Sequence, residues 1–218
     1  MDKLIRHKFN NELKSILFHY IYSNNDNDEL SKLVKKEPMM MFEMSLSVWN
    51  RIIQFKLKDV NPNALSDYID KQDPMIYREI SRIICEPVFY EVLFFELKIN
   101  DPKLRYNCIH EITVGRVFPN DIHLADIEFT NPYEPIPKFL AKSPNQIFKG
   151  LGLLGQQIDR LVEYAKKNNC GFVTLTASSI NEYELFKKYG FQLEDSDIAE
   201  IGLKSGSGIP MDLKINGY

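Results

Sequence analysis

The first fifty residues have the apolar spacing of amphipathic helices. Apolar side chains recur every three or four positions over residues 9–22, which predicts a helix with one buried face. The polar stretch SNNDND interrupts this pattern at residues 23–28, and helical spacing then returns as far as about Trp49. We find no residues of distinctive chemistry in this segment, and we expect it to form a helical extension.

From residue 51 onward the spacing changes to that of a mixed fold. Apolar and polar residues alternate in RIIQFKLKD, which predicts a half-buried strand over residues 51–59. Two helices should follow. Asn63 is a suitable N-cap for the first, and Asp73 with Pro74 gives the second an N-cap and a proline at its first helical position.

Segments rich in aromatic and β-branched residues then predict three consecutive antiparallel strands, at residues 88–99, 107–118 and 122–129. A long helix is expected after a glycine cluster, closed by Gly171 in a left-handed conformation. A strand at 172–177, a helix over NEYELFKKY and closing strands in FQLED and PMDLKI complete the predicted order. This succession of elements is typical of an α+β fold.

Composition narrows the class of protein. The 218 residues include 27 Lys and Arg against 30 Asp and Glu, and no basic cluster suggests a nucleic-acid partner. The three cysteines and four histidines have no metal-ligand spacing, so we expect no metal site. The sequence has neither a signal-peptide pattern nor an apolar run of about 20 residues, so we expect a cytoplasmic protein without a membrane partner.

The stretch KGLGLLGQQ at residues 149–157 places Gly150, Gly152 and Gly155 in the spacing G-x-G-x-x-G. Glycines at a helix N-terminus let phosphates approach unpaired backbone N–H groups at the positive end of the helix dipole. A dinucleotide-binding fold would need a strand directly before the glycines and an acidic residue after the next strand, and the sequence has neither. The alternative is that the glycines only permit close helix packing.

Together, the strand order and the glycines resemble the GNAT superfamily of acyl-CoA N-acyltransferases. In that family a Q/R-x-x-G-x-G/A loop opens a long helix after an antiparallel strand. Gly150 and Gly152 match this loop, whereas Ile147 stands in place of the leading Gln or Arg. Family members also carry an Asn and then a helix that ends in aromatic-x-x-x-Gly-Phe, which matches Asn181 and residues 186–191.

The resemblance implies a GNAT-like mixed, mostly antiparallel sheet flanked by helices over residues 51–218, preceded by the helical extension at 1–50. It implies acetyl-CoA or another acyl-CoA as donor, an amine of a small molecule or a protein as acceptor, and direct attack in a ternary complex. Oligomer formation stays open. The cofactor-binding residues that it implies are Phe148, Lys149, Gly150, Leu151, Gly152, Leu153, Asn181 and Phe186.

The base for such a reaction is expected on the strand at 122–129. An alkylamine has a pKa near ~10.4 and arrives protonated, so a group must accept its proton. Strict alternation would put Leu124, Asp126 and Glu128 on one face of the strand. The segment Ala125-Asp126-Ile127 resembles the Ala-Glu-Ile of histone acetyltransferases, which makes Asp126 the first candidate base and Glu128 the second. The alternative is that they are solvated edge carboxylates.

Three further residues are weaker candidates for proton transfer: Glu111 and His110 on the neighbouring strand at 107–118, and His123 on the strand at 122–129. Asn181 is expected either to bond the pantetheine arm of the cofactor or to cap its helix.

The expected proton donor to the departing thiolate is missing from its usual position. Many GNAT members have a Tyr where this chain has Phe186, which has no proton to give. Tyr183 and Tyr189 lie about one helical turn to either side, and either could substitute. Tyr183 is the candidate acid, and the alternatives are a water molecule or a reaction without an acid. The missing tyrosine also supports an alternative function, a GNAT-fold CoA-binding or regulatory module without transferase activity.

Overall fold

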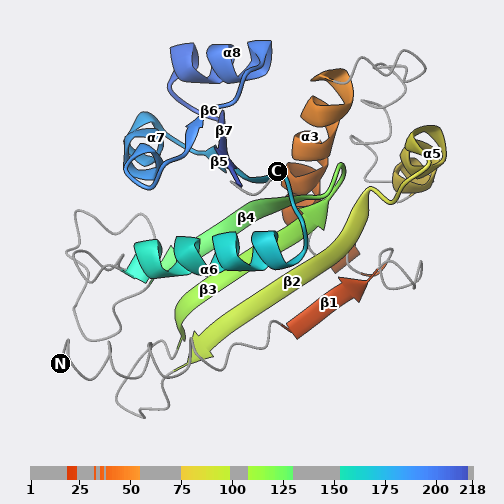
Figure 1. The fold of residues 1–218 in the computed structure, drawn as a ribbon, viewed down its shortest axis with the longest axis horizontal. Coiled ribbons are helices and arrows are strands. Elements are labelled where there is room, and N and C mark those ends of the chain that lie inside the picture. Colours follow the sequence, from red (N-terminus) through yellow and green to blue (C-terminus); the bar gives the residue numbers. More distant parts are fainter. Residues whose placement is uncertain are drawn as a thin grey trace.

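The computed structural model describes residues 19–23, 32, 35–36, 38–54, 75–98, 108–129 and 153–215. They form a seven-stranded sheet in the order β1-β2-β3-β4-β5-β7-β6 (Figure 1). Among the described strands, β4 and β5 pair in parallel and every other neighbouring pair is antiparallel. The predicted mixed, mostly antiparallel sheet is therefore confirmed.

Strands and helices are interspersed along the chain. The strands are β1 (His19–Ser23), β2 (Phe89–Lys98), β3 (Cys108–Val117), β4 (Asp121–Phe129), β5 (Phe172–Ala177), β6 (Gln192–Leu193) and β7 (Ile209–Lys214). The helices are α3 (Pro38–Gln54), α5 (Met75–Ile84), α6 (Leu153–Lys167), α7 (Ile180–Lys187) and α8 (Asp197–Ser205). Within the described residues, no helix is both long enough and apolar enough to cross a membrane.

Helices α6 and α3 lie on opposite faces of the sheet (Figure 1), and an apolar cluster lies under each helix. From α6, Ile158, Leu161 and Ala165 enter the larger cluster at helical spacing. From α3, the residues of the inner stripe are Met41, Met44, Val48 and Ile52. Each of these side chains is almost completely buried, so the sheet is sandwiched between the two helices.

Two predictions for the N-terminal part are wrong. Residues 19–22 belong to strand β1, because they pair with the edge of β2, a contact that local spacing cannot indicate. Residues 51–54 belong to α3, because Val48 and Ile52 continue its buried stripe one turn apart. The predicted helix up to about Trp49 is confirmed as part of α3. Since α3 continues through residue 50, the division of the chain at that point stays a prediction.

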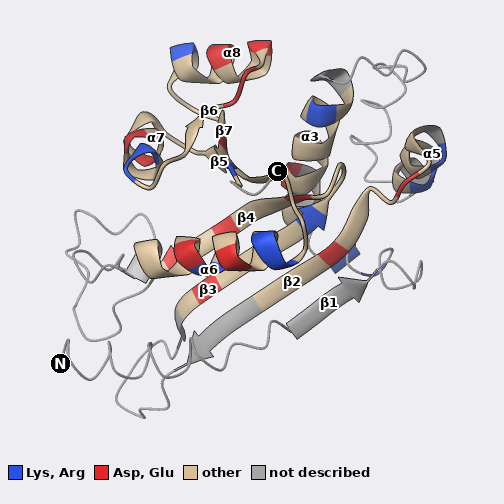
Figure 2. Cartoon of the chain, viewed as in Figure 1, with Lys and Arg blue, Asp and Glu red and all other residues tan. Residues whose placement is uncertain are grey.

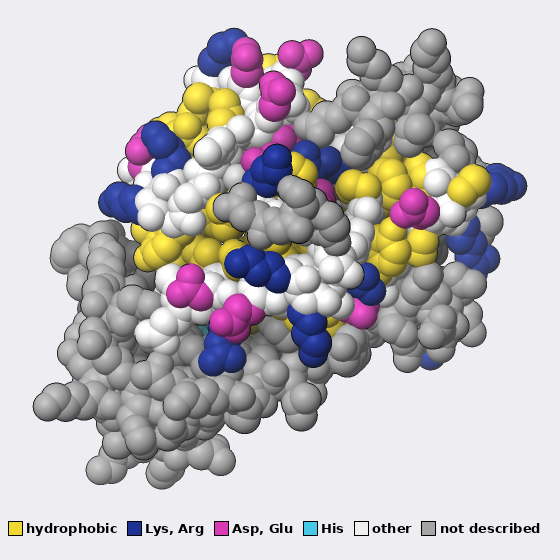
Figure 3. Space-filling view, viewed as in Figure 1, with side chains coloured by type: hydrophobic (Ala, Val, Ile, Leu, Met, Phe, Trp, Pro, Cys, Tyr) yellow, Lys and Arg dark blue, Asp and Glu magenta, His cyan; other side chains and the backbone are white. Residues whose placement is uncertain are grey.

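The C-terminal part contains one helix that the sequence analysis missed. Helix α8 begins after Ser196, whose side chain accepts a hydrogen bond from the Ala199 N–H, and ends at Gly206 with φ 77°. This N-cap and this left-handed glycine are ordinary helix signals. The helix exposes Ile198 and Ile201, in a region where apolar side chains reach the surface (Figure 3).

The predicted end of α6 also differs in detail. The residue in the left-handed conformation is Asn169, with φ 54°, and Gly171 does not have a positive φ. Asparagine tolerates this conformation better than most residues. The N–H of Cys170 then bonds the carbonyl oxygen of Ala165 at 2.9 Å and closes the helix.

A buried cation ties α3 to the sheet. Arg51 Nε lies 3.2 Å from Asp121 Oδ2, and Arg51 Nη2 lies 3.7 Å from Asp212 Oδ2. Its guanidinium is 4.7 Å from the ring centroid of Phe172, whose N–H donates to Asp121 Oδ1 at 3.0 Å. These contacts join α3 to β4, β5 and β7 at one point.

Buried titratable groups should give the fold a composite pH dependence. Burial, with a smaller effect of Arg51, lowers the pKa of His123 to about 4. As the pH falls below about 6.5, His123 binds a proton in the unfolded chain but stays neutral in the folded chain until the pH nears 4. His123 therefore makes the fold less stable below about pH 6.5. Burial raises the pKa of Asp121 to about 6, so its effect has the opposite sign: stability is lost as the pH rises through 6.

We expect His123→Asn to lose less unfolding free energy than the wild type between pH 7 and pH 4. The difference should be on the order of 3 kcal/mol, because one unit of pKa corresponds to about 1.4 kcal/mol. Urea unfolding at both pH values measures it. Asp121→Asn is the matched comparison and should change the pH slope in the other direction. Parallel pH slopes for all three proteins would contradict the assignment.

Candidate functional site

The parallel pair β4–β5 joins the two antiparallel halves of the sheet. Three residue pairs form its ladder: Ile122–Val173, His123–Thr174 and Leu124–Leu175. Both strands continue beyond this ladder, β4 paired with β3 and β5 paired with β7. The two strands therefore stop pairing with each other towards their C-terminal ends. In sheets with parallel strands, ligands bind outside the carboxyl ends of strands where neighbouring connections diverge.

An extra residue in β4 marks the point of separation. The register between β3 and β4 passes from Val114–Leu124 to Thr113–Asp126, so Ala125 has no partner of its own in β3. Such a β-bulge bends the strand and shifts by one residue the set of side chains on each face.

The predicted facing of the β4 side chains is wrong because of this bulge. Strict alternation would place Leu124 on the same face as Asp126 and Glu128. Instead Leu124 shares the α6 face with Ile127 and Phe129, which lie beyond the bulge. Asp126 and Glu128 consequently project towards the opposite face, which α3 covers.

Helix α3 runs antiparallel to β4 on that face. Near its end, Arg51 contacts the start of β4. In its middle, Ser47 Oγ lies 3.3 Å from Thr174 Oγ1 on β5. Near its beginning, Glu43 is close enough to Asp126 for their charges to interact. The helix thus spans the β4–β5 ladder and brings its first turns to the place where the strands separate.

Carboxylates gather at this place, and Figure 2 shows the acidic positions of β3 and β4 in red. Glu111 and Glu128 are directly opposite each other in the β3–β4 ladder. Burial raises the pKa of Asp126, and the charges of Glu128 and Glu111 raise it further, against a hydrogen bond from the Ile127 N–H that lowers it. Asp126 is nevertheless exposed to solvent, so its carboxylate is close to other negative charges and is also accessible.

Burial likewise raises the pKa of Glu43, and the charge of Asp126 adds to this effect. A carboxylate whose pKa is raised is a better proton acceptor for an amine. Glu43 was not predicted as a site residue, although the sequence contains a signal for it. Glu43, Ser47 and Arg51 recur every four residues beside the apolar stripe of α3, so this polar row lies next to the buried face.

Helix α6 begins where the candidate phosphate loop ends. Its first residue is Leu153, whose side chain is not described. Its start lies at the same end of the sheet as the end of β4 (Figure 1). The first turn of a helix carries unpaired N–H groups that bind anions. The predicted positions outside the described residues are Phe148, Lys149, Gly150, Leu151 and Gly152.

The third glycine of the cluster has a packing role. A Cβ on Gly155 would lie 3.1 Å from Tyr189 Cε1, tighter than most such contacts. Tyr189 itself is partly buried against the core cluster. Close helix packing, one of the two interpretations of the glycines, therefore applies to Gly155.

The N-terminus of α7 is capped by Ser179, and Asn181 is not the cap. The Ser179 side chain accepts a hydrogen bond from the Glu182 N–H, and the Glu182 carboxylate accepts one from the Ser178 N–H at 2.8 Å. Asn181 lies in the first turn and is exposed. The capping interpretation of Asn181 is wrong, and its predicted role in holding the cofactor stays a prediction.

The aromatic residues of α7 have different environments. Phe186 is 7% exposed, and its ring meets Phe191 edge to face with centroids 5.6 Å apart. Tyr183 is partly buried against the same cluster, and Lys187 Nζ lies 5.1 Å from its ring centroid. Phe186 is thus a core residue, and the proposed acid role of Tyr183 stays a prediction.

The two strand histidines are less suited to accept a proton. His110 and His123 are each 1% exposed, and burial lowers the pKa of both to about 4. His123 Nδ1 lies 2.9 Å from Thr174 Oγ1, inside the β4–β5 ladder. Both rings are neutral at pH 7 and are weaker bases than an ordinary histidine.

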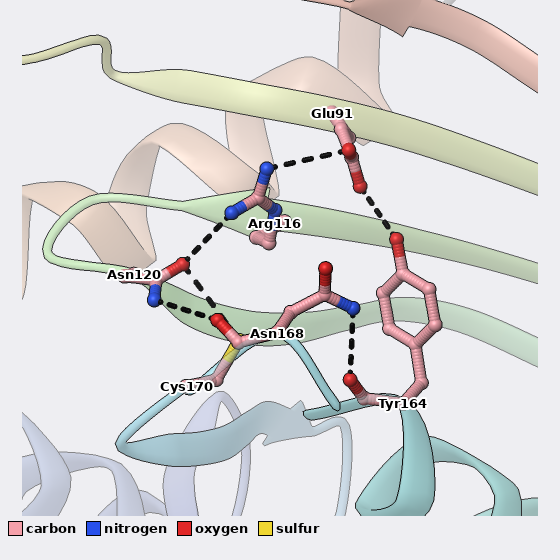
Figure 4. A network of polar contacts seen from close by, with 6 residues as sticks. All are labelled: Glu91, Arg116, Asn120, Tyr164, Asn168 and Cys170. Carbon is pink, nitrogen blue, oxygen red and sulfur yellow. Dashed lines mark hydrogen bonds and ion pairs between the residues drawn. The ribbon is translucent and has the colours of Figure 1, made fainter. Parts of the chain in front are cut away.

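A polar network fixes the far end of α6 to the sheet (Figure 4). The Tyr164 hydroxyl on α6 donates to Glu91 on β2 at 2.5 Å, and Arg116 on β3 pairs with the same carboxylate at 3.3 Å. Arg116 also donates to Asn120, which in turn donates to the carbonyl oxygen of Asn168 at 3.1 Å. These contacts hold the C-terminal end of α6 against the sheet.

The crowding of the carboxylates can be tested directly. We expect Glu128→Gln to lower the pKa of Asp126, because the substitution removes the negative charge that repels it most strongly. Carbon NMR titration of the carboxyl groups measures this shift. Glu200→Gln is the control, since Glu200 lies on α8 and pairs with Lys204. An Asp126 pKa that is the same in Glu128→Gln and in the wild type would show that the two charges are not coupled.

Comparison with solved structures found chains that are acetyltransferases. Nourseothricin acetyltransferase is 15% identical with a TM-score of 0.38, over 57% of this chain and 65% of that one. The chain thus spans less than two thirds of that enzyme. A Bacillus subtilis acetyltransferase in complex with CoA is 15% identical with a TM-score of 0.35, over 72% of this chain and 94% of that one.

A third similar structure is the PaiA N-acetyltransferase of Thermoplasma acidophilum in complex with coenzyme A. It is 16% identical with a TM-score of 0.34, over 91% of this chain and 99% of that one. No family model and no curated protein matches the sequence. These similarities concern the fold alone. The chain's own sheet order, with helices on both faces, has the architecture that its resemblance to the GNAT superfamily predicts.

Proposed function

We propose that the protein is an acyl-CoA-dependent N-acyltransferase that transfers an acyl group, with acetyl as the first candidate, to an amine. One observation carries the proposal. The bulge at Ala125 separates β4 from β5 and turns Asp126 and Glu128 to the α3 face, at the end of the sheet where α6 begins. The start of α6, which suits an anion, therefore lies at the same end of the sheet as the crowded carboxylates, which can accept a proton.

The residues present fit an acyl-CoA donor. A helix N-terminus suits a pyrophosphate, and α6 begins at Leu153, directly after the predicted loop that starts at Phe148. Asn181, in the first turn of α7, is exposed and available to a ligand. When bound, acyl-CoA supplies the carbonyl carbon that the amine attacks and the thiolate that leaves.

The chain's own groups would then move the protons. Asp126 accepts a proton from the amine, directly or through water, and its raised pKa favours this role. Glu128 is the second candidate, and its charge helps to keep Asp126 basic. Tyr183 or a water molecule would return a proton to the thiolate, because Phe186 cannot do so.

A second candidate function is a CoA-binding or regulatory module without transferase activity. The observation that favours it is the core position of Phe186, packed against Phe191, where a catalytic tyrosine is expected from the family resemblance. Calorimetric titration with acetyl-CoA, followed by a turnover assay over a broad panel of amines, separates the two. Binding with turnover supports the enzyme, and binding without turnover of any amine supports the module.

The glycines provide a matched pair of substitutions for the donor site. We expect Gly152→Val to weaken acetyl-CoA binding by at least about 100-fold, because a branched side chain would block the approach of the phosphates to the backbone. Gly155→Ala should change the dissociation constant by less than about threefold. The added Cβ would contact Tyr189, so this substitution tests helix packing and not the approach of the phosphates. Calorimetry measures both, with NAD and NADP as ligand controls. Unchanged affinity in Gly152→Val would remove the loop from the site.

The base is tested by Asp126→Asn. We expect kcat to fall about 100-fold, a typical contribution of a general base, with little change in the affinity for acetyl-CoA. The rise of kcat with pH should also flatten, since it reports the ionisation of this group. If kcat and its pH profile match the wild type, Asp126 is not the base, and Glu128→Gln and then Glu111→Gln become the next variants to assay.

A further inference from the structure

Among the described strands, the end of β4 beyond the bulge pairs on one side only. Pairing with β5 ends at Leu124, whereas pairing with β3 continues to Phe129. Asp126 and Glu128, the two candidate bases, both lie in this segment. A base must stay within hydrogen-bond reach of the group it deprotonates, so a second restraint on this strand end matters for turnover.

His110 on β3 supplies such a restraint from the α6 face. Its Nδ1 lies 2.9 Å from the carbonyl oxygen of Glu128, and its ring stacks on Phe129 with centroids 4.3 Å apart and planes 6° apart. A carbonyl oxygen only accepts, so Nδ1 must carry the hydrogen. Because the ring is neutral at pH 7, its Nε2 is then an acceptor.

Gln157 on α6 lies beside this ring. Its side chain is fully buried, and within the part of the chain that the structure describes neither its amide nitrogen nor its amide oxygen has a hydrogen-bond partner. The amide nevertheless interacts with the His110 ring as a weak hydrogen-bond partner, which raises the pKa of the ring against the larger effect of burial. An unpaired buried amide costs about 1–3 kcal/mol, so packing alone gives no reason for a glutamine at this position.

We propose that His110 is a positioning residue for the proposed acyl transfer. It fixes the backbone of β4 at Glu128, and Gln157 links it to α6, so that the candidate bases keep their place relative to the donor helix. The inference rests on the proposed function, because acyl transfer is the step that needs the fixed carboxylate. His110 does not touch the acceptor amine, since its ring lies on the α6 face and the carboxylates lie on the α3 face.

Two substitutions separate the hydrogen bond from the ring stack. His110→Asn keeps an N–H donor near the position of Nδ1 and loses the ring, whereas His110→Phe keeps a flat ring on Phe129 and loses the donor. We expect His110→Phe to lower kcat about tenfold, the rate equivalent of one hydrogen bond, with less than about a twofold change in the dissociation constant for acetyl-CoA. His110→Asn should keep kcat within about threefold of the wild type.

Two kinetic results would overturn the inference. One is a wild-type kcat in His110→Phe. The other is an equal loss in both variants accompanied by weaker acetyl-CoA binding, which is the mark of a structural role. Gln157→Met, similar in length but without the amide, should lower kcat in the same direction as His110→Phe, and an unchanged kcat would overturn the link to α6.

Backbone amide hydrogen exchange on the intact protein gives a readout that needs no turnover. His110→Phe should accelerate exchange at residues 127–129 and leave exchange at residues 122–124 as in the wild type. In His110→Asn, exchange at residues 127–129 should stay as slow as in the wild type. No acceleration overturns the positioning role, even if the enzyme acylates amines. A wild-type protein that neither binds acetyl-CoA nor acylates amines overturns the proposed function, and the exchange rates still decide whether His110 fixes β4.

Discussion

Three parallel residue pairs between β4 and β5 hold the two halves of the sheet together. On one side of this ladder stand β1 to β3, and on the other β7 and β6. So short a ladder needs reinforcement, and each face provides it. Arg51 joins α3 to β4, β5 and β7 from one side, and α6 packs over β4 and β5 from the other. The candidate site lies directly beyond this reinforced ladder.

The bulge at Ala125 gives that site its chemical character. One extra residue ends the pairing with β5, bends β4 and moves Asp126 and Glu128 to the face of α3. There Asp126 lies near Glu43, Glu111 and Glu128, and desolvation together with like charges raises the pKa values of Asp126 and Glu43 above those of isolated carboxylates. The register shift in β4 therefore makes the Asp126 carboxylate a stronger base.

The sequence alone predicted the elements whose signals are local. The aromatic and β-branched runs of β2 and β3, the apolar stripe of α6 and the helix predicted over NEYELFKKY, which is α7, are examples. It failed chiefly where a distant partner decides the outcome, although α8, whose Ser196 and Gly206 signals are local, was missed as well. Strand β1 exists because β2 offers it an edge, and the bulge is invisible in LADIEF because the register is set by β3. Glu43 was missed because α3 reaches the site through tertiary packing.

The short parallel ladder also has a consequence for the order of folding. Ile122 and Val173, which begin the ladder, are about 50 residues apart in the chain, whereas β2, β3 and β4 follow one another directly and pair as a meander. Closing a long loop costs entropy before any contact offsets it, so each half of the sheet should assemble before the two halves join. The last native surface to form is then the one where the proposed donor binds. A ligand that bridges both halves would act as a non-covalent cross-link and slow their separation.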